Sequence, residues 1–357
     1  DQDSGSVRTS RTIRVMQAMG CKVTFVADNL EYKEPYVGDL RGEGVEVLHW
    51  PFTRSVEGHI EDHGREYDVI VLSRYYVATK YIDCARRHAP QALLVLDTHD
   101  LHYLRTRRLA ELEGSRALAQ SAEAMYAQEM DCIRRMDATW VVSPVEREVL
   151  AREVPQARVV VATNIHYPAA EVPPFAAREG IVFVGGYRHP PNVDAALFYA
   201  REVVPHLREL LPGVTSYLIG SNPPQVLRDL SGPGIEFVGF VPEIEPWFRR
   251  CRLSVSPLRY GAGVKGKINH SMSFGLPVVA TTPSVEGMHL ADGEEILVAD
   301  EPRAFAEAVA RLYRDEALWN RLSAAGLANV RRHFSPEAAQ RALEETFAMA
   351  PRREGTR

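Results

Sequence analysis

The sequence predicts an α/β protein with two parallel-sheet domains in succession, each of the Rossmann type. Short apolar, β-branched strands alternate with helical stretches in both halves of the chain, which is typical of a parallel sheet covered by helices on both faces. A proline-rich stretch without periodicity, residues 164–179, interrupts the alternation and is typical of a linker. The 357 residues suffice for two separate cores.

The first domain is expected over residues 1–170. It opens with a helical pattern, residues 7–19, where a doubly wound domain normally opens with a buried strand, so its first strand is expected to be missing. One long helix is predicted around residues 105–135. Strands are predicted at residues 22–27, 45–48, 68–73, 92–97, 138–143 and 158–162.

The second domain is expected over residues 171–335, and residues 336–357 form a final helical segment that crosses back to the first domain. Two α/β halves without a shared sheet are expected to face each other across a cleft, with ligands beyond the carboxyl ends of the strands. Predicted strands lie at residues 181–184, 215–219, 235–238, 253–256, 278–281 and 295–299, and helices at 302–313, 316–333 and 336–349.

Composition and motif searches exclude several classes of protein. A net charge of −5 argues against bulk binding of nucleic acid. The cysteines, Cys21, Cys84, Cys132 and Cys251, lack metal-site spacing and predict reduced, cytoplasmic thiols. The patterns GxSxG, HExxH and the phosphate-binding P-loop are absent, as are an apolar run of membrane-spanning length and a secretory signal. A formal GxGxxG match at residues 261–266 is discounted because basic residues crowd it.

Residues 256–282 carry the strongest chemical signal. A strand runs into a turn with two glycines, two lysines follow, and a short helix and a β-branched strand complete the segment. Glycines bare the backbone, a helix N-terminus presents N–H groups, and Arg259, Lys265 and Lys267 supply positive charge, a combination that suits a diphosphate. The alternative is an ordinary strand-to-helix turn with solvated lysines. On a helix the two lysines would diverge by about 200°, so both cannot face one pyrophosphate. We favour Lys265 because it lies on the loop side of Gly266.

A second loop offers similar chemistry. The strand at residues 181–184 ends in Gly185 and Gly186, Arg188 follows, and Asn192 is predicted to cap a helix that opens at Val193. Backbone amides and Arg188 could hold a phosphate. In the first half, His99 follows a strand and could donate a hydrogen bond to a sugar hydroxyl, although a capping or packing histidine is the alternative.

The pattern Gly263–Ala280, GVKGKINHSMSFGLPVVA, resembles the donor site of retaining glycosyltransferases of family 4, whose usual form is a glycine-rich turn followed by Lys-x-x-Glu-Ala-x-x-x-Gly-x-Pro-Val-Val-Ala. The resemblance extends to residues 183–186, 285–288 and 296–300. The family's paired glutamates, eight positions apart, would fall on Ala262 and His270, and neither is a carboxylate.

The resemblance implies the GT-B fold and transfer of a sugar, with retention, from a nucleoside-diphosphate sugar to a glycan or lipid-linked acceptor. It implies bacterial surface polysaccharide or glycoconjugate synthesis in the cytoplasm, with peripheral contact at the inner face of the membrane. No metal or other cofactor and no nucleic-acid partner are expected. Two alternatives stay open: a catalytically silent subunit that partners an active transferase, and a nucleotide-sugar epimerase of the same fold.

The resemblance also implies roles for individual residues. The catalytic residues would be His99, Arg188 and Lys265, and Arg8 would assist the first glycine loop or simply start a helix. Asn269 and His270 would contact ribose hydroxyls, and Val241 the base, unless Val241 only packs at the strand end. Glu286 would contact a sugar or ribose hydroxyl, unless it caps or pairs on the surface. The full set of donor-binding residues is Gly5, Gly186, Val241, Gly263, Lys267, Asn269, His270 and Glu286.

Overall fold

The computed structural model describes residues 4–261 and 263–351. They divide into two compact units, which we describe separately. The described residues of the N-terminal unit are Gly5–Thr163 and 339–351, and those of the C-terminal unit are Asn164–Ala338 together with Ser4. The chain thus passes from one unit to the other at residue 164 and again at residue 339. The sequence predicted these domain boundaries at residues 171 and 336.

The N-terminal unit contains six strands, all in parallel pairs, at the positions that the sequence predicts. Two of them, β1 and β2, pair with each other, and the other four form a sheet in the order β3-β4-β5-β6. Their bounds are Thr24–Val26 (β1), Glu46–Leu48 (β2), Val69–Ser73 (β3), Leu93–Asp97 (β4), Ala138–Val141 (β5) and Val159–Val161 (β6).

Helices connect these strands. The predicted single helix around residues 105–135 is wrong, because Gly114 adopts a left-handed conformation (φ 62°) that ends α5 and Ser115 caps the start of α6. The helices are α1 (Ser4–Ala18), α2 (Tyr36–Gly42), α3 (Val56–His63), α4 (Tyr75–His88), α5 (His102–Glu113), α6 (Arg116–Arg134) and α7 (Pro144–Glu153), with a 3₁₀ turn η1 at Gly64–Glu66.

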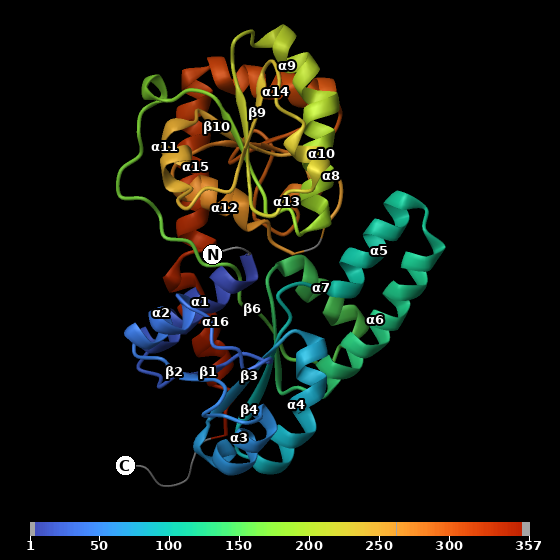
Figure 1. The fold of residues 1–357 in the computed structure, drawn as a ribbon, viewed down its shortest axis with the longest axis vertical. Helices are drawn as coiled ribbons and strands as arrows, with labels where there is room; N and C mark the ends of the chain where they lie inside the picture. The colour runs from blue at the N-terminus through green and yellow to red at the C-terminus, as the bar shows by residue number, and fades with distance from the viewer. Residues whose placement is uncertain (1–3, 262, 352–357) are drawn as a thin grey trace. The chain divides into compact units, whose positions relative to one another are not determined.

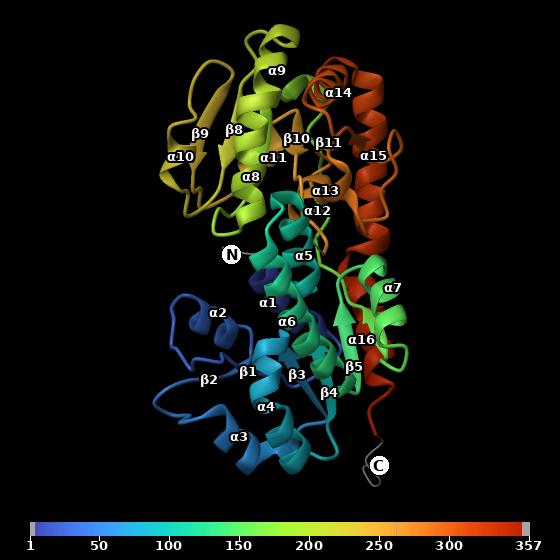
Figure 2. The same cartoon turned by 90° about the vertical axis from the view of Figure 1, so that its right-hand side faces the viewer.

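The last helix, α16 (Pro336–Phe347), completes the N-terminal unit. Its Thr346 side chain accepts a hydrogen bond from the buried Trp140 indole on β5 (2.8 Å). Figure 2 shows α16 beside β5. Because a buried indole N–H without a partner is costly, this bond fixes the last helix against the sheet.

The C-terminal unit contains a six-stranded parallel sheet in the order β12-β11-β10-β7-β8-β9. The strands again match their predicted positions, and they confirm the predicted second Rossmann-like sheet. Their bounds are Ile181–Val184 (β7), Ser216–Ile219 (β8), Ile235–Gly239 (β9), Leu253–Ser256 (β10), Val278–Ala280 (β11) and Leu297–Val298 (β12).

Helices cover both faces of this sheet, and Figure 1 shows α8 and α9 on one side and α11 and α12 on the other. The helices are α8 (Pro190–Phe198), α9 (Val204–Leu210), α10 (Gln225–Arg228), α11 (Glu245–Arg250), α12 (Gly266–Ser273), α13 (Thr282–Val285), α14 (Pro302–Arg314) and α15 (Glu316–His333). A 3₁₀ turn, η2 (Phe175–Ala177), and a π-helical turn, η3 (Tyr199–Val203), complete the unit.

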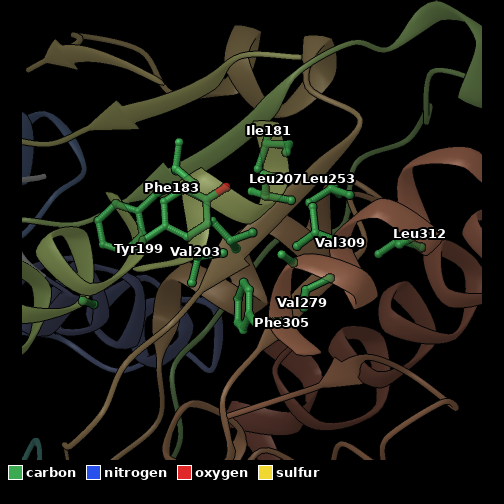
Figure 3. Packing of buried hydrophobic residues seen from close by; sticks show 14 of the residues in the cluster. Ile181, Phe183, Tyr199, Val203, Leu207, Leu253, Val279, Phe305, Val309 and Leu312 are labelled. Atoms are coloured by element: carbon green, nitrogen blue, oxygen red, sulfur yellow. The ribbon is translucent and has the colours of Figure 1, made fainter. Parts of the chain in front are cut away.

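Alternation along the strands explains the two covered faces. Ile181 and Phe183 of β7 pack with Tyr199, Val203 and Phe305 on one face (Figure 3). Val182, between them, belongs to a second cluster on the other face. Since successive strand residues point to opposite faces, a strand buried on both faces is mostly apolar, as β7 is. No helix among the described residues is both long and apolar enough to cross a membrane.

Candidate functional site

The strand order of the C-terminal unit places two loops side by side. β7 and β10 are adjacent in the sheet, and the chain leaves β7 toward α8 but leaves β10 toward α12. In doubly wound sheets, ligands bind beyond the carboxyl ends of strands at such a switch point. The loop after β7 carries Gly186 and Arg188, and the loop after β10 carries Gly263 and Lys265. The two predicted phosphate loops are therefore neighbours.

A lysine and an asparagine join these loops. The Lys267 ammonium donates a hydrogen bond to Asn192 Oδ1 (2.5 Å), and Asn192 Nδ2 donates to the Gly186 carbonyl (2.8 Å). Lys267 Nζ also lies 4.9 Å from the centre of the Phe183 ring. The expected capping role of Asn192 is wrong, because α8 begins at Pro190, where proline is favoured, and Asn192 lies inside its first turn.

Lys265 lies immediately before α12, which begins at Gly266. Its side chain is buried, and its ammonium donates to the Gly263 carbonyl (2.8 Å). Removal from water, and then the charge of Lys265, lower the pKa of Lys267 to about 7. The predicted separation of the two lysines on a helix therefore does not apply, because Lys265 precedes the helix. Two cations that repel each other at a helix N-terminus form a site that a bound anion would stabilise.

The two arginines near these loops differ in their surroundings. Arg259 donates from Nε to Asp194 Oδ2 on α8 (2.9 Å), and a second hydrogen bond joins Arg259 Nη2 to Asp194 Oδ1. Arg188 is exposed in the turn between β7 and α8. Arg259 therefore ties β10 to α8, while the expectation that Arg188 binds a phosphate stays a prediction.

The two predicted ribose-binding residues lie on α12. Asn269 is fully buried, and neither atom of its amide group has a hydrogen-bond partner among the described residues. The His270 ring lies 4.9 Å from the Phe248 ring, 5.6 Å from the Phe274 ring and 5.7 Å from the His166 ring, measured between centroids. His270 is thus part of an aromatic cluster, and its contact with ribose stays a prediction.

The remaining donor-site predictions meet different surroundings. Val241 is half-buried and packs against the cluster that contains Phe248. Gly263 has a φ of 66°, a conformation that favours glycine. Glu286 is half-buried and ends α13, at the carboxyl end of β11. The glycine loop expected at Gly5 is wrong, since Gly5 lies within α1, where its carbonyl accepts from Thr9. Ala262 lies outside the described residues.

In the N-terminal unit, His99 follows β4 in a strained conformation. Its φ is 63°, which is uncommon for a residue with a side chain, and its side chain is 9% exposed. Neither ring nitrogen has a hydrogen-bond partner among the described residues, although Nε2 lies 3.4 Å from Asp97 Oδ2. Strain combined with unmade hydrogen bonds is typical of functional residues. Asp100 pairs with His102 Nε2 (3.1 Å) and Arg105 rather than with His99.

An ion pair that the sequence did not predict lies beside His99. Arg8 of α1 and Asp97 at the end of β4 are both buried, and Arg8 Nη1 donates to Asp97 Oδ2. Arg8 also donates two hydrogen bonds to the Ala162 carbonyl, from Nη2 (2.6 Å) and Nε (3.2 Å). Asp97 Oδ1 in turn accepts from the His99 backbone N–H (3.3 Å). The sequence signal that could have indicated this ion pair is Asp97 itself, a charged residue at the end of an otherwise apolar strand.

The charges of this group set its protonation. Burial raises the pKa of Asp97, but in the acidic range in which Asp97 titrates the positive charges of Arg8 and His99 outweigh this effect, and the pKa is lowered overall. Burial lowers the pKa of His99, Asp97 opposes this, and Arg8 and Arg74 reinforce it. Asp97 is therefore ionised and His99 neutral near pH 7.

Two buried glutamates hold the chain that follows His99. Glu129 on α6 accepts from the backbone N–H groups of His102 (3.3 Å) and Tyr103 (3.2 Å). Glu146 on α7 accepts from the N–H groups of Leu101 (3.2 Å) and Val142 (3.0 Å). Burial raises the pKa of Glu129 to about 8. The segment Ser143-Pro-Val-Glu146 has the sequence pattern of a capping box, and Ser143 Oγ accepts from the Glu146 N–H, while the Glu146 carboxylate accepts from Val142, one residue before the cap.

One group of potential metal ligands occurs among residues 4–261 and 263–351. Glu61 of α3 and Cys84 and His88 of α4 have ligand atoms within 4.8 Å of one another. Glu61 is exposed, and Cys84 and His88 are half-buried. The four cysteines are free thiols.

Comparison with known proteins bears on this geometry. Residues 178–315, which include the β7 and β10 loops, match the model of the family described as Glycosyl transferases group 1. The C-terminal unit is a group 1 glycosyltransferase domain. The phosphatidyl-myo-inositol mannosyltransferase of Mycobacterium leprae (strain TN) is 24% identical over 160 residues, which are 43% of this chain and 42% of that protein.

A second relative is the lipopolysaccharide core biosynthesis mannosyltransferase LpsB of Rhizobium meliloti (strain 1021). It is 32% identical over 118 residues, 32% of this chain and 33% of that protein. The chain therefore matches between a third and about two fifths of the length of these two curated relatives.

Solved glycosyltransferase structures resemble the chain over nearly all of its length. HepE of Anabaena, in complex with UDP-glucose, has a TM-score of 0.69 and 15% identity, and the match covers 98% of each chain. Sucrose-phosphate synthase of Thermosynechococcus elongatus has a TM-score of 0.69 and 17% identity over 95% of this chain and 92% of that one. The group 1 domain thus belongs to a GT-B fold with two Rossmann-like units, as the sequence predicted.

Proposed function

We propose that this protein is a glycosyltransferase that moves a sugar, with retention of configuration, from a nucleoside-diphosphate sugar to a glycan or lipid-linked acceptor. The observation that supports this most is the pair of lysines, Lys265 and Lys267, at the N-terminus of α12 beside the Gly186 loop. Of the two mannosyltransferase relatives, one is named for phosphatidyl-myo-inositol and the other for lipopolysaccharide core biosynthesis. We therefore place this chain in bacterial glycoconjugate synthesis.

The residues suggest how the reaction would be assisted. When the bond between the sugar and the diphosphate breaks, negative charge builds up on the leaving diphosphate. Lys265, Lys267 and the first amides of α12 could stabilise that charge without a metal ion. In this mechanism the diphosphate accepts the proton of the acceptor hydroxyl, so that no carboxylate nucleophile is needed at position 262 or 270. His99 would hydrogen-bond a sugar hydroxyl through a ring nitrogen.

Incubation with a panel of nucleotide sugars tests the proposal. We expect one donor among UDP-, GDP- and dTDP-sugars to be hydrolysed slowly alone and faster when a glycan or lipid-linked acceptor is added. The anomeric configuration of the product, read by NMR, tests retention. Stabilisation by nucleoside diphosphates without any turnover would instead support a catalytically silent subunit, and interconversion of the free nucleotide sugar would support an epimerase.

The free cysteines favour a reducing compartment, so we place the enzyme in the cytoplasm, with acceptor contact at the membrane surface.

A further inference from the structure

Asp97 Oδ2 lies between a guanidinium and an imidazole. Arg8 Nη1 donates to this oxygen, and His99 Nε2 lies 3.4 Å from it. The Asp97 side chain is buried, only 5% exposed, so its charge requires a partner inside the protein. Either cation could serve. In the structure Arg8 makes the hydrogen bond and the His99 ring does not.

The placement of Arg8 explains why Arg8, rather than His99, forms the hydrogen bond with Asp97. Its guanidinium is fixed by the two hydrogen bonds to the Ala162 carbonyl at the end of β6, in addition to Asp97. It therefore ties α1, β4 and the end of β6 together. A guanidinium remains charged at every pH at which the protein is folded, whereas an imidazole does not.

We propose that Arg8 is a positioning residue that keeps the His99 ring neutral by engaging the Asp97 carboxylate as its ion-pair partner. A neutral imidazole has one donor and one acceptor nitrogen, so it can exchange hydrogen bonds with a hydroxyl group. An imidazolium ion paired with Asp97 would lose its acceptor and turn toward the carboxylate. The role of His99 toward a sugar hydroxyl rests on the proposed function, but the control of its charge does not.

The other charged groups around His99 agree with this assignment. Burial is the largest influence on the ring and favours its neutral form. Among the charged groups, Asp97 and Asp100 favour its charged form, and Arg8 and Arg74 favour its neutral form. Asp100 is already paired with His102 and Arg105, which leaves Asp97 as the carboxylate to be controlled. Without Arg8, the His99 ring would still lie 3.4 Å from Asp97 and could serve as its cation. An opposite charge at this distance typically shifts a pKa by about 1–3 units.

The test measures the titration of His99 by NMR of ring-labelled histidine, with the His99 signal assigned from H99Q. R8Q removes the positive charge but keeps amide donors for Asp97 and Ala162. We expect the His99 midpoint to rise by about 1–3 pH units in R8Q, to stay near the wild-type value in R8K, and to fall again in R8Q/D97N. An unchanged midpoint in folded R8Q would overturn the proposal. If R8Q does not fold, the His99 titration in the wild-type protein still tests the proposal, because a His99 ring that is charged at pH 7 would also overturn the proposal.

The experiment separates this inference from the proposed function. NMR titration requires no turnover, so a shifted midpoint without transfer activity would leave the role of Arg8 intact and remove the catalytic one. If both hold, the acidic limb of the kcat profile moves upward in R8Q with the His99 midpoint. A merely structural role would lower activity at all pH values without moving that limb.

Discussion

Lys267 and Asn192 are 75 residues apart in sequence, yet the ammonium of one donates to the side-chain oxygen of the other. The same asparagine holds the Gly186 carbonyl, so a single amide group connects the loop after β7 with the first turn of α12. The lysine is thereby held beside Lys265 although burial and like charge both oppose its ionisation. We infer that the two lysines bind an anion, because a bound negative charge would offset both the burial of Lys267 and its repulsion from Lys265.

The first prediction concerns the pH dependence of donor binding. The pKa of Lys267 is about 7, and a diphosphate binds the charged form. Binding must therefore be accompanied by proton uptake above pH 7, and the affinity for UDP should fall as pH rises from 7 to 9. Calorimetry in two buffers of different ionisation enthalpy would measure the proton uptake. K267R stays charged over this range and should lose the slope, whereas equal wild-type affinities at pH 7 and 9 would contradict the assignment.

Lys265→Ala should lower turnover at least ~100-fold, the scale of losing one charge-stabilising donor. Lys265 donates to the Gly263 carbonyl next to the lysine pair, so its removal also frees that turn. The measurement is kcat with saturating donor, with circular dichroism to confirm the fold. Lys22, whose side chain is 85% exposed in the N-terminal unit, provides a matched control, and K22A should behave as wild type. Turnover within about threefold of wild type would transfer the role to Lys267.

His270→Phe separates a packing role from a polar one. Phenylalanine keeps the contacts with the rings of Phe248 and Phe274 but cannot hydrogen-bond. We expect the unfolding temperature to be retained and UDP affinity to fall by about 3–10-fold, the scale of one neutral hydrogen bond. H270E restores the family's carboxylate and should bind UDP at least as tightly as H270F. Wild-type affinity in H270F would show that the ring only packs.

Glu286 provides a test at the end of α13. If its carboxylate accepts from a sugar or ribose hydroxyl, Glu286→Ala should weaken donor binding by about 1.5–3 kcal/mol, and Glu286→Gln by less, because an amide oxygen still accepts. Calorimetry with the intact nucleotide sugar would measure both. Equal affinities for wild type and the two variants would return Glu286 to a surface role.

Glu129 should make the stability of the N-terminal unit depend on pH. Its folded-state pKa, about 8, lies above the ordinary value of 4.5, so the folded protein holds a proton that unfolding releases. This raised pKa favours folding at low pH, and the advantage is lost as pH rises from about 5 to 8. Urea unfolding at several pH values would measure this. The free energy of unfolding should decrease less steeply with rising pH in E129Q than in wild type, by up to ~1.4 kcal/mol per pH unit. Parallel curves would contradict the shift.

The sequence predicted the strands well because burial on both faces favours runs of apolar residues, as in Leu93–Leu96 of β4 and in β7. It also singled out Lys265 and Lys267, which the structure places at the start of α12, although their role toward a diphosphate stays a prediction. Partners between distant segments could not be predicted in the same way. Nothing in the local sequence shows that Asn192 accepts from Lys267, or that Arg8 reaches Asp97, because side-chain approach depends on strand order. The break between α5 and α6 was visible as Gly114-Ser115 but was outweighed by helical periodicity.

The bond between Trp140 and Thr346 joins residues 206 positions apart. All of the C-terminal unit lies between them in the chain. At the usual pace of translation, about 5–20 residues per second, the ribosome takes roughly 10–40 s to add such an interval. Until residue 346 has been added, the Trp140 indole has no α16 to bind. The segment Asn164–Ala338 is complete before that point. The part of the protein that is begun first should therefore be the last to be finished during synthesis.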